Sequence, residues 1–214
     1  MSNILVVESE NDKFFIEALV NHINIKLNVE TPICSIDDYE CIGGIGELKK
    51  RLKEIQARVK KEAIDKLGII VDADKKGVSQ REKEVLDIFK EVFSDEPIDC
   101  SIYIINKDGY GELEDILLEI KSKNSSIADC LDAFQDCLPD DKKLNQKEIN
   151  KLKINFYQRY DCCSKIEKKQ AGKKCNNEVS LKNKEIYNFD HEILDDLKEF
   201  LKRLGESNDN TTSD

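Results

Sequence analysis

Short runs of apolar residues alternate with longer stretches of helical spacing along the first 125 residues of the chain. The runs predict strands at 3–7, 34–42, 69–71 and 100–106. Apolar positions three and four apart predict helices over 12–22, 47–67, 79–93 and 111–121. Ser79 is the expected cap of the third helix. Continuously apolar strands that alternate with helices are typical of a parallel sheet covered on both faces, so we expect an α/β domain over residues 1–125.

The pattern changes after residue 125, where helical stretches follow one another without a strand between them. Helices are predicted over 128–138, 145–163 and 190–204, with a polar loop at 164–178. The apolar faces of these helices are narrow, so residues 126–205 are expected to form a helical extension packed on the sheet. The polar residues 206–214 are predicted to be a disordered tail.

Charge and hydropathy restrict the class of protein further. The 214 residues carry a formal net charge of −10, which argues against broad, non-specific binding to a polyanion. Basic residues cluster at 49–61 and 165–174, where a solvated surface is the first interpretation and phosphate binding is the alternative. No apolar run has the length of a membrane span, and the first run lacks the basic flank of a signal peptide. We expect a cytoplasmic protein without a membrane partner.

Eight cysteines are present, but their spacing does not suit a zinc site. They form no C-x-x-C pair, and only two histidines, His22 and His191, are available as further ligands. In a reducing cytoplasm the expected state is therefore reduced thiols without disulfide bonds. Cys162, Cys163 and Cys175 are the one group whose positions justify a check for zinc.

Acidic residues follow two of the predicted strands. Glu8 ends the first strand, and Asp72 and Asp74 end the third. The Gly43-Gly44 pair follows the second strand. Because ligands bind at the carboxyl ends of parallel strands, these segments are expected to meet at one edge, where carboxylates suit Mg²⁺ or Mn²⁺. The alternative is that the acids only mark where strands reach water, since 44 of the 214 residues are Asp or Glu.

Three segments, in this order, resemble the Toprim domain of topoisomerases, primases and several nucleases. They are "ILVVESEND", the Gly-Gly loop and "IIVDAD". Glu8 and Asp12 match the family pattern E-G-x-x-D, with Ser9 in place of the glycine. Asp72 and Asp74 match the family's D-x-D. Glycine permits positive φ and close approach of a ligand, so Ser9 predicts a less open first turn.

The chain looks most similar to small stand-alone bacterial Toprim-like proteins. These also have a G-x-L-E-D-x-L-L helix, here at 111–118, and a closing F-D-H-x-x-L-x-x-L-x-x-F-L helix, here at 189–201. The likeness therefore spans most of the chain, and it implies a Toprim-like, Rossmannoid parallel sheet flanked by helices.

The resemblance also implies a metal-dependent site. Glu8, Asp72 and Asp74 are the expected catalytic residues and, together with Glu114, the expected ligands of Mg²⁺ or Mn²⁺. Glu8 is the candidate general acid or base. The expected supporting residues are Asp12, Gly43, Gly44 and Asp115, and the expected phosphate-binding residues are Lys75 and Lys76. For Glu114 and Asp115 the structural alternative is an acid favoured by the dipole at a helix start.

Three functions fit these features. The first is a metal-dependent nuclease, a hydrolase of DNA or RNA, because topoisomerase and primase activities need domains that 214 residues do not supply. A role in defence or in RNA processing fits the resemblance. The second is a Toprim-like module without catalysis that binds nucleic acid or a protein partner. The third is a receiver domain with Asp72 as phosphoacceptor, which leaves Asp74 and the helical extension without a role.

Overall fold

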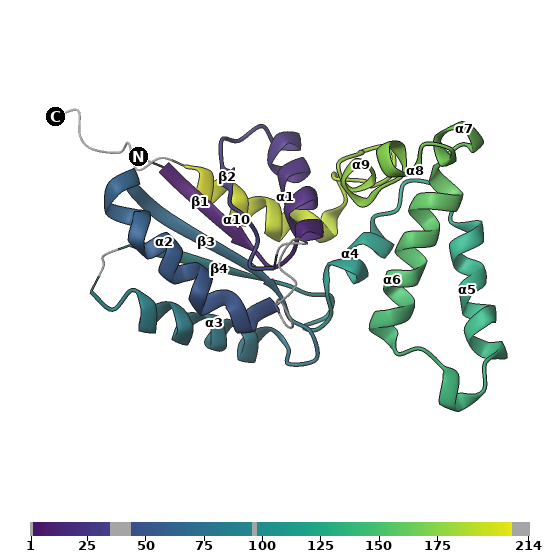
Figure 1. Ribbon diagram of the computed structural model, residues 1–214, viewed down its shortest axis with the longest axis horizontal. Helices are drawn as coiled ribbons and strands as arrows, with labels where there is room; N and C mark the ends of the chain where they lie inside the picture. The colour runs from purple at the N-terminus through teal and green to yellow at the C-terminus, as the bar shows by residue number, and fades with distance from the viewer. Residues whose placement is uncertain (1, 35–43, 96–97, 207–214) are drawn as a thin grey trace.

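The computed structural model describes residues 2–34, 44–95 and 98–206 (Figure 1). The strands in these ranges are β1 (Ser2–Val7), β2 (Asn28–Val29), β3 (Ile64–Asp72) and β4 (Asp99–Ile105). They form one sheet in the order β2-β1-β3-β4, and every neighbouring pair is parallel. The predicted α/β fold, with a parallel sheet flanked by helices, is confirmed.

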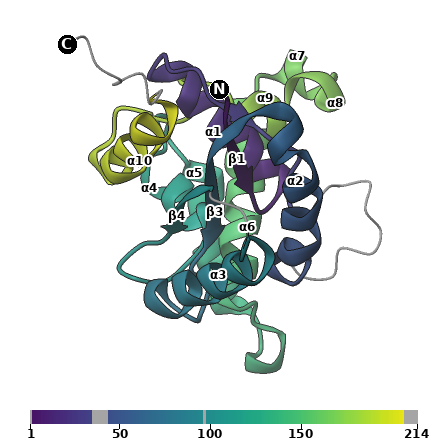
Figure 2. The ribbon, with the colours of Figure 1, turned by 90° about the vertical axis from the view of Figure 1, so that its left-hand side faces the viewer.

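Helices cover both faces of the sheet (Figures 1 and 2). One face carries α2 (Leu48–Glu62) and α3 (Val78–Val92), and the other carries α1 (Glu10–His22) and α10 (Asp195–Gly205). Successive side chains of a strand point to opposite faces. Val6 of β1 therefore joins the apolar core under α2 and α3, while Val7 joins the core under α1 and α10.

The remaining helices continue beyond the edge of the sheet. After β4 come α4 (Leu113–Glu119), then α5 (Ser126–Cys137) and α6 (Gln146–Phe156), a helical pair that projects away from the sheet (Figure 1). A π-helical turn, η3 (Tyr157–Cys162), leads to the short helices α7 (Lys165–Lys168), α8 (Ala171–Lys174) and α9 (Asn177–Leu181). Single 3-10 turns are η1 (Gly44–Glu47), η2 (Asp140–Lys142) and η4 (Glu192–Leu194). The chain then returns to the sheet as α10.

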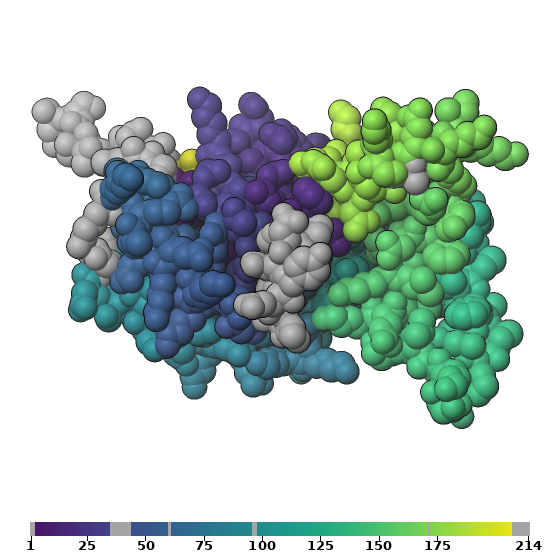
Figure 3. Space-filling view, in the orientation of Figure 1, coloured from purple at the N-terminus to yellow at the C-terminus, as the bar shows by residue number. Residues whose placement is uncertain are grey.

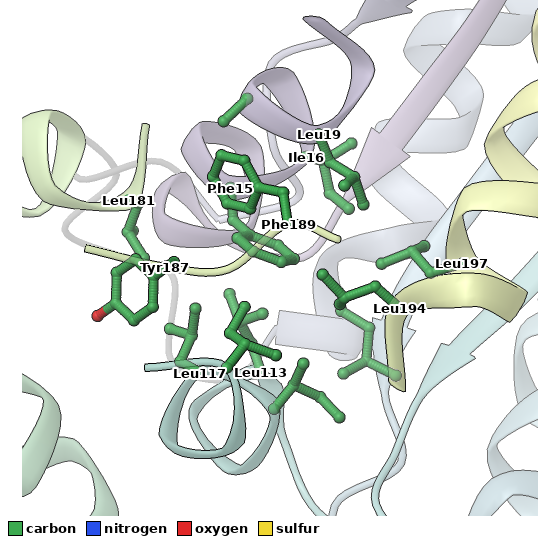
Figure 4. Packing of buried hydrophobic residues seen from close by; sticks show 14 of the residues in the cluster. Phe15, Ile16, Leu19, Leu113, Leu117, Leu181, Tyr187, Phe189, Leu194 and Leu197 are labelled. Carbon is green, nitrogen blue, oxygen red and sulfur yellow. The ribbon is translucent and has the colours of Figure 1, made fainter. Parts of the chain in front are cut away.

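Aromatic packing between α1 and α4 fixes the returning segment. Phe189 lies against Phe15 of α1, with ring centroids 5.9 Å apart, and in the same buried cluster as Leu113 of α4 (Figure 4). Further along, Gly68 of β3 has no side chain, and a Cβ there would overlap Leu204 of α10. The last helix therefore packs directly on the strand, so the C-terminal segment completes the core of the N-terminal α/β part.

Two predicted elements near the second and third strands differ from the structure. The strand predicted at 34–42 lies almost wholly outside the described residues, and the strand beside β1 is the short β2. The helix predicted over 47–67 is wrong beyond Glu62, because Ala63 adopts a left-handed φ of 48° and its N–H closes the last turn on Val59. Ile64, which continues the helical spacing, instead begins β3 and is buried.

Two other local predictions are wrong. The N-cap of α3 is Gly77, with φ at 82°, rather than Ser79, which lies inside the first turn. The segment 164–178 is not a loop, because Ser164 and Asn176 cap short helices within it. The polar composition of the segment gave no apolar spacing from which to predict these helices, and the residues of α7 are mostly exposed.

Cys163 and Cys175 form a disulfide bond, and Cys34 is also disulfide-bonded. The prediction of reduced thiols throughout is therefore wrong. The short helices α7 and α8 fold the intervening segment back, so the two Cα atoms lie 6.3 Å apart, a separation that a disulfide spans. Cys162, grouped with this pair in the sequence, is a free thiol. In the described ranges no helix is long and apolar enough to span a membrane.

Candidate functional site

The carboxyl ends of β1 and β3 bring Glu8 and Asp72 together. Glu8 directly follows β1, and Asp72 is the last residue of β3, the parallel neighbour of β1. The N–H of Asp72 donates to Glu8 Oε2 at 3.3 Å, and the N–H of Leu113, at the start of α4, donates to Asp72 Oδ1 at 3.0 Å. Three segments that are distant in sequence thus meet at this edge of the sheet, and two of them are the ends of parallel strands.

Asp12 lies at the start of α1, where it forms a capping box with Ser9. The N–H and the Oγ of Ser9 both donate to Asp12 Oδ2 at 2.7 Å, and the N–H of Asp12 donates to Ser9 Oγ at 3.3 Å. The φ of Ser9 is −132°, an extended conformation that does not require glycine. Serine therefore fits this turn without backbone strain and fixes Asp12, which is 5% exposed.

Four carboxylates at this edge, Glu8, Asp12, Asp72 and Glu114, act on one another electrostatically, and we name them the inner acids. Burial raises the pKa of Asp72 well above its usual range, and the charges of the other three raise it further. Burial also raises the pKa of Asp12 to about 7, although the hydrogen bonds from Ser9 oppose the rise. The pKa of Glu8 is raised as well, again mainly by burial. The fold thus holds Glu8, Asp12 and Asp72 where ionisation is unfavourable.

The cationic side chains of the site lie closer to the acids that surround the inner acids than to the inner acids themselves. Asp74 and Glu112, which we name the outer acids, both pair with Lys147 of α6, at 3.3 and 2.6 Å. Lys151, one turn further along α6, lies 3.5 Å from Glu112 and 4.0 Å from Glu114. Across the described ranges, no ion pair is formed by the three other inner acids. The outer acids are therefore neutralised by the protein, whereas most of the inner charge is not.

Arg81 joins the start of α3 to the end of β3. Its side chain is 5% exposed, pairs with Asp74 and lies 3.0 Å from Glu84, and its Nε donates to the carbonyl oxygen of Asp72 at 3.0 Å. Asp74 has a left-handed φ of 50°, and two backbone hydrogen bonds with Gly111, at 2.8 and 3.1 Å, hold it in that conformation. The D-x-D segment is therefore fixed from both sides.

Asp115 has a structural part in the site. One oxygen accepts from the N–H of Glu112 at 2.8 Å, and the other accepts from Asn150 Nδ2 of α6 at 2.7 Å. Gly111, at a φ of 94°, leaves the space that the Asp115 carboxylate occupies. These bonds join α4 to α6, and they position Lys147 over the outer acids.

Gly44 makes room for Glu8. A Cβ on Gly44 would overlap the carboxylate of Glu8, while a Cβ on Gly46, two residues later, would meet nothing within 4 Å. The glycine at position 44 is thus required by the placement of an acid from another segment. Gly43, the other glycine singled out in the sequence, lies outside the described residues.

A cleft of about 670 Å³ opens beside the outer acids, and we name it the α6 cleft. Its walls include Lys75 and Lys76 after β3, Tyr110 before α4, and Lys147 and Asn150 on α6. In the space-filling view the surface is indented between the teal residues of α3 and the green residues of α6 (Figure 3). Lys75 and Lys76, singled out as phosphate-binding residues, therefore line a concave surface next to the acids.

The chemistry of the inner acids fits a hard divalent cation. Their donor atoms are all carboxylate oxygens, the ligands that Mg²⁺ and Mn²⁺ prefer, and a bound cation would favour the ionised forms of Glu8, Asp12 and Asp72, whose pKa values burial raises. In the part of the chain that the structure describes, no three such side chains converge as a ready-made metal site. Binding of a metal therefore requires the carboxylates to turn toward a common point.

Comparison with known proteins identifies the family. The family model described as "Protein of unknown function (DUF3226)" matches residues 2–206. The chain belongs to the DUF3226 family. The DUF3226 match includes the sheet, the inner acids, α6 and α10, so sheet and helical extension belong to one family unit. No curated protein and no solved structure matches the chain.

Several residues of the candidate site were not singled out in the sequence. Glu112, Arg81, Tyr110, Lys147 and Lys151 all contact or line the site in the structure. The only sequence signal for the two lysines is their i, i+4 spacing, which places them on one face of a helix. Nothing in that spacing identifies what the face contacts, since the partner acids lie more than thirty residues away.

Proposed function

We propose that this chain is a Mg²⁺- or Mn²⁺-dependent phosphodiesterase of the Toprim type that cleaves DNA or RNA. One observation carries the proposal: Glu8, Asp12 and Asp72 have raised pKa values and form no ion pair within the described residues. A divalent cation would stabilise such a group of carboxylates. The sequence resemblance to Toprim domains at the same acids supports the proposal.

The proposed chemistry assigns a role to each acid. Glu8 and Asp72 would hold the metal, with Asp74 and Glu114 as further ligands. The chemistry that a bound metal would supply is polarisation of the scissile phosphate and stabilisation of the charge that develops on it. Glu8 would take up or release a proton, the role that the resemblance to Toprim domains implies for the first acid. Lys75 and Lys76, which line the adjoining cleft, contact phosphate groups of the substrate.

A second candidate is a Toprim-like module that binds nucleic acid without cleaving it. Two observations favour it: no three carboxylates converge within the described residues, and Lys147 already pairs with both outer acids. In that case Lys147 is a permanent structural cation, and the inner acids stay protonated or are solvated. The two candidates differ in whether the protein needs a metal.

Metal binding is tested first, by thermal melts in chelator and in Mn²⁺. Binding only to the folded state adds about 2.7 kcal/mol at a hundredfold excess over Kd, so the midpoint is expected to rise. Asp72→Asn, which keeps the shape of the side chain, is expected to remove the rise. Asp87→Asn is the matched control, because Asp87 lies exposed on α3. An unchanged wild-type midpoint at millimolar Mn²⁺ would overturn the proposal.

Cleavage is tested with labelled single-stranded and double-stranded DNA and RNA in Mg²⁺ and Mn²⁺. The wild type and Asp87→Asn are expected to cleave at least one of these substrates, while Asp72→Asn and Glu8→Gln are expected to be inactive but folded. Metal binding without cleavage of any substrate would select the module without catalysis. Equal cleavage by wild type and Asp72→Asn would show that the activity comes from elsewhere.

A further inference from the structure

Tyr110 is a large aromatic side chain that folding leaves 59% exposed at the edge of the α6 cleft. The other exposed large apolar side chains of the described residues lie outside this cleft: Ile127, Phe134, Tyr160, Ile166 and Val179. One exposed aromatic residue is ordinary on a protein surface. Tyr110 differs because it stands between lysine side chains and carboxylates, where a charged ligand has polar partners.

The backbone holds Tyr110 in a fixed position. Asp108 and Gly109 have φ values of 55° and 90°, and they form a two-residue turn that Lys107 and Tyr110 close with hydrogen bonds of 2.7 and 3.2 Å. The ring lies next to Gly77, where an added Cβ would be 2.9 Å from Tyr110 Cε1. The ring is therefore supported by backbone on one side and accessible elsewhere. Little side-chain conformational entropy is then lost when a flat ligand stacks on it.

The cleft beside the ring carries several cationic side chains, although the whole chain has a net charge of −10, and two of them, Lys76 and Arg81, pair with Glu84. Four cationic side chains and three carboxylates line it, and the three carboxylates already accept bonds from Arg81, Lys147, Asn150 or the backbone. Lys75 is exposed and pairs with no carboxylate of the described ranges. Its ammonium group is therefore available to an anionic ligand.

From these features we infer that the α6 cleft binds a single-stranded segment of DNA or RNA, with one base stacked on Tyr110 and phosphates held by Lys75 and Lys147. The volume of about 670 Å³ lies within the range of about 300–1,000 Å³ that is usual for ligand sites. A duplex keeps the faces of its bases stacked on one another, so only an unpaired base can stack on the ring. The inference rests on the proposed function and names its substrate class: unpaired nucleotides beside the acids.

Fluorescence anisotropy in chelator tests the inference without metal or cleavage. The probes are labelled oligothymidylate, oligouridylate, a blunt duplex of mixed sequence and an abasic strand of equal length. The wild type is expected to bind one of the single strands more tightly than the duplex. Tyr110→Ala is expected to weaken that binding about tenfold, in line with the stacking of one base, and to leave binding of the abasic strand unchanged.

Matched variants separate stacking from charge and from misfolding. Tyr110→Phe keeps the ring, and Tyr160→Ala removes an exposed aromatic residue elsewhere, so both are expected to bind like the wild type. Lys75→Met is expected to weaken all strands and to reduce the salt slope by about 0.7, the value for one phosphate contact to a single strand. Lys83→Met, on the exposed face of α3, is its control. Thermal midpoints show that each variant is folded.

The outcomes also distinguish this inference from the proposed function. Tighter binding of the duplex, equal binding by Tyr110→Ala and wild type, or no binding of any probe would overturn the inference. Metal-dependent cleavage that Asp72→Asn abolishes would still support the phosphodiesterase. Conversely, binding that depends on Tyr110, without any metal-dependent cleavage, would leave the cleft as a nucleic-acid site and refute the phosphodiesterase.

Discussion

Asp12→Asn is expected to stabilise the metal-free protein at neutral pH and to have little effect in acid. Burial and the neighbouring acids raise the pKa of Asp12 from 3.8 to about 7. A raised pKa means that the folded protein holds the proton more tightly than the unfolded chain does. The stability from this group is fully present below pH 3.8 and is lost as the pH rises through about 7. Asparagine has no charge to acquire, so the variant avoids this loss.

The magnitude follows from the same two pKa values. At about pH 4.5 Asp12 is still protonated in the folded form, and its raised pKa lowers the free energy of unfolding by about 1 kcal/mol relative to strong acid. At about pH 7.5 this loss reaches about 4 kcal/mol. The advantage of Asp12→Asn is therefore expected to grow by up to about 3 kcal/mol between these pH values. This is an upper bound, because Glu8 and Asp72 share the relief when the charge on Asp12 is removed. The amide oxygen of asparagine can still accept from Ser9, so the helix cap is retained.

Urea unfolding in chelator, followed by circular dichroism because the chain has no tryptophan, measures the effect. Asp87→Asn, on the exposed face of α3, controls for the loss of one negative charge from the whole protein. In Mn²⁺ the wild type is expected to recover stability at neutral pH, and the variant less so. A difference between wild type and variant that stays constant or shrinks as the pH rises would refute the electrostatic argument.

Two further expectations follow from neighbouring contacts. Gly44→Ala is expected to displace the Glu8 carboxylate and to lower Mn²⁺ affinity about tenfold or more, as happens when a metal ligand loses its support. Gly46→Ala is expected to leave the affinity unchanged, and calorimetric titration compares the two variants. Cys163→Ser is expected to lower the free energy of unfolding by about 2–3 kcal/mol, because it opens the loop that the disulfide closes between residues 163 and 175. Peptide mapping of the unreduced protein would contradict the pairing if it found no link between Cys163 and Cys175.

The sheet was predictable from the sequence because its strands are continuously apolar. β1 and β4 appear nearly at their predicted positions; β1 is buried on both faces and therefore needs an unbroken run of apolar residues, while β4, at the edge of the sheet, is buried only at its end. The start of β3 was not predictable in this way, because Ile64 fits the apolar stripe of the preceding helix as well as the strand. The left-handed conformation of Ala63 ends the helix and lets Ile64 begin the strand, and no local residue preference predicts that conformation.

The candidate site was predictable only where it is built from strand ends. Glu8 and Asp72 meet because parallel strands end at one edge, which is a rule of topology. Lys147 depends instead on how α6 is docked, and that docking depends on the bonds from Asp115 to Asn150 and to the start of α4. Such side-chain contacts between segments far apart in sequence have no local periodicity, so patterns of spacing do not reveal them.

The division between inner and outer acids limits what can balance the charge at this edge of the sheet. Lys147 and Arg81 neutralise the outer acids, but no cationic side chain of the described residues forms an ion pair with Glu8, Asp12 or Asp72. Above pH 7 the protein has two ways to offset these buried charges: it retains protons, at a cost in stability that grows with pH, or it binds a cation. The first predicts a protein that steadily loses stability as the pH rises. The second predicts a protein whose stability above pH 7 depends on metal, because each bound cation replaces the protons that the raised pKa values would otherwise retain.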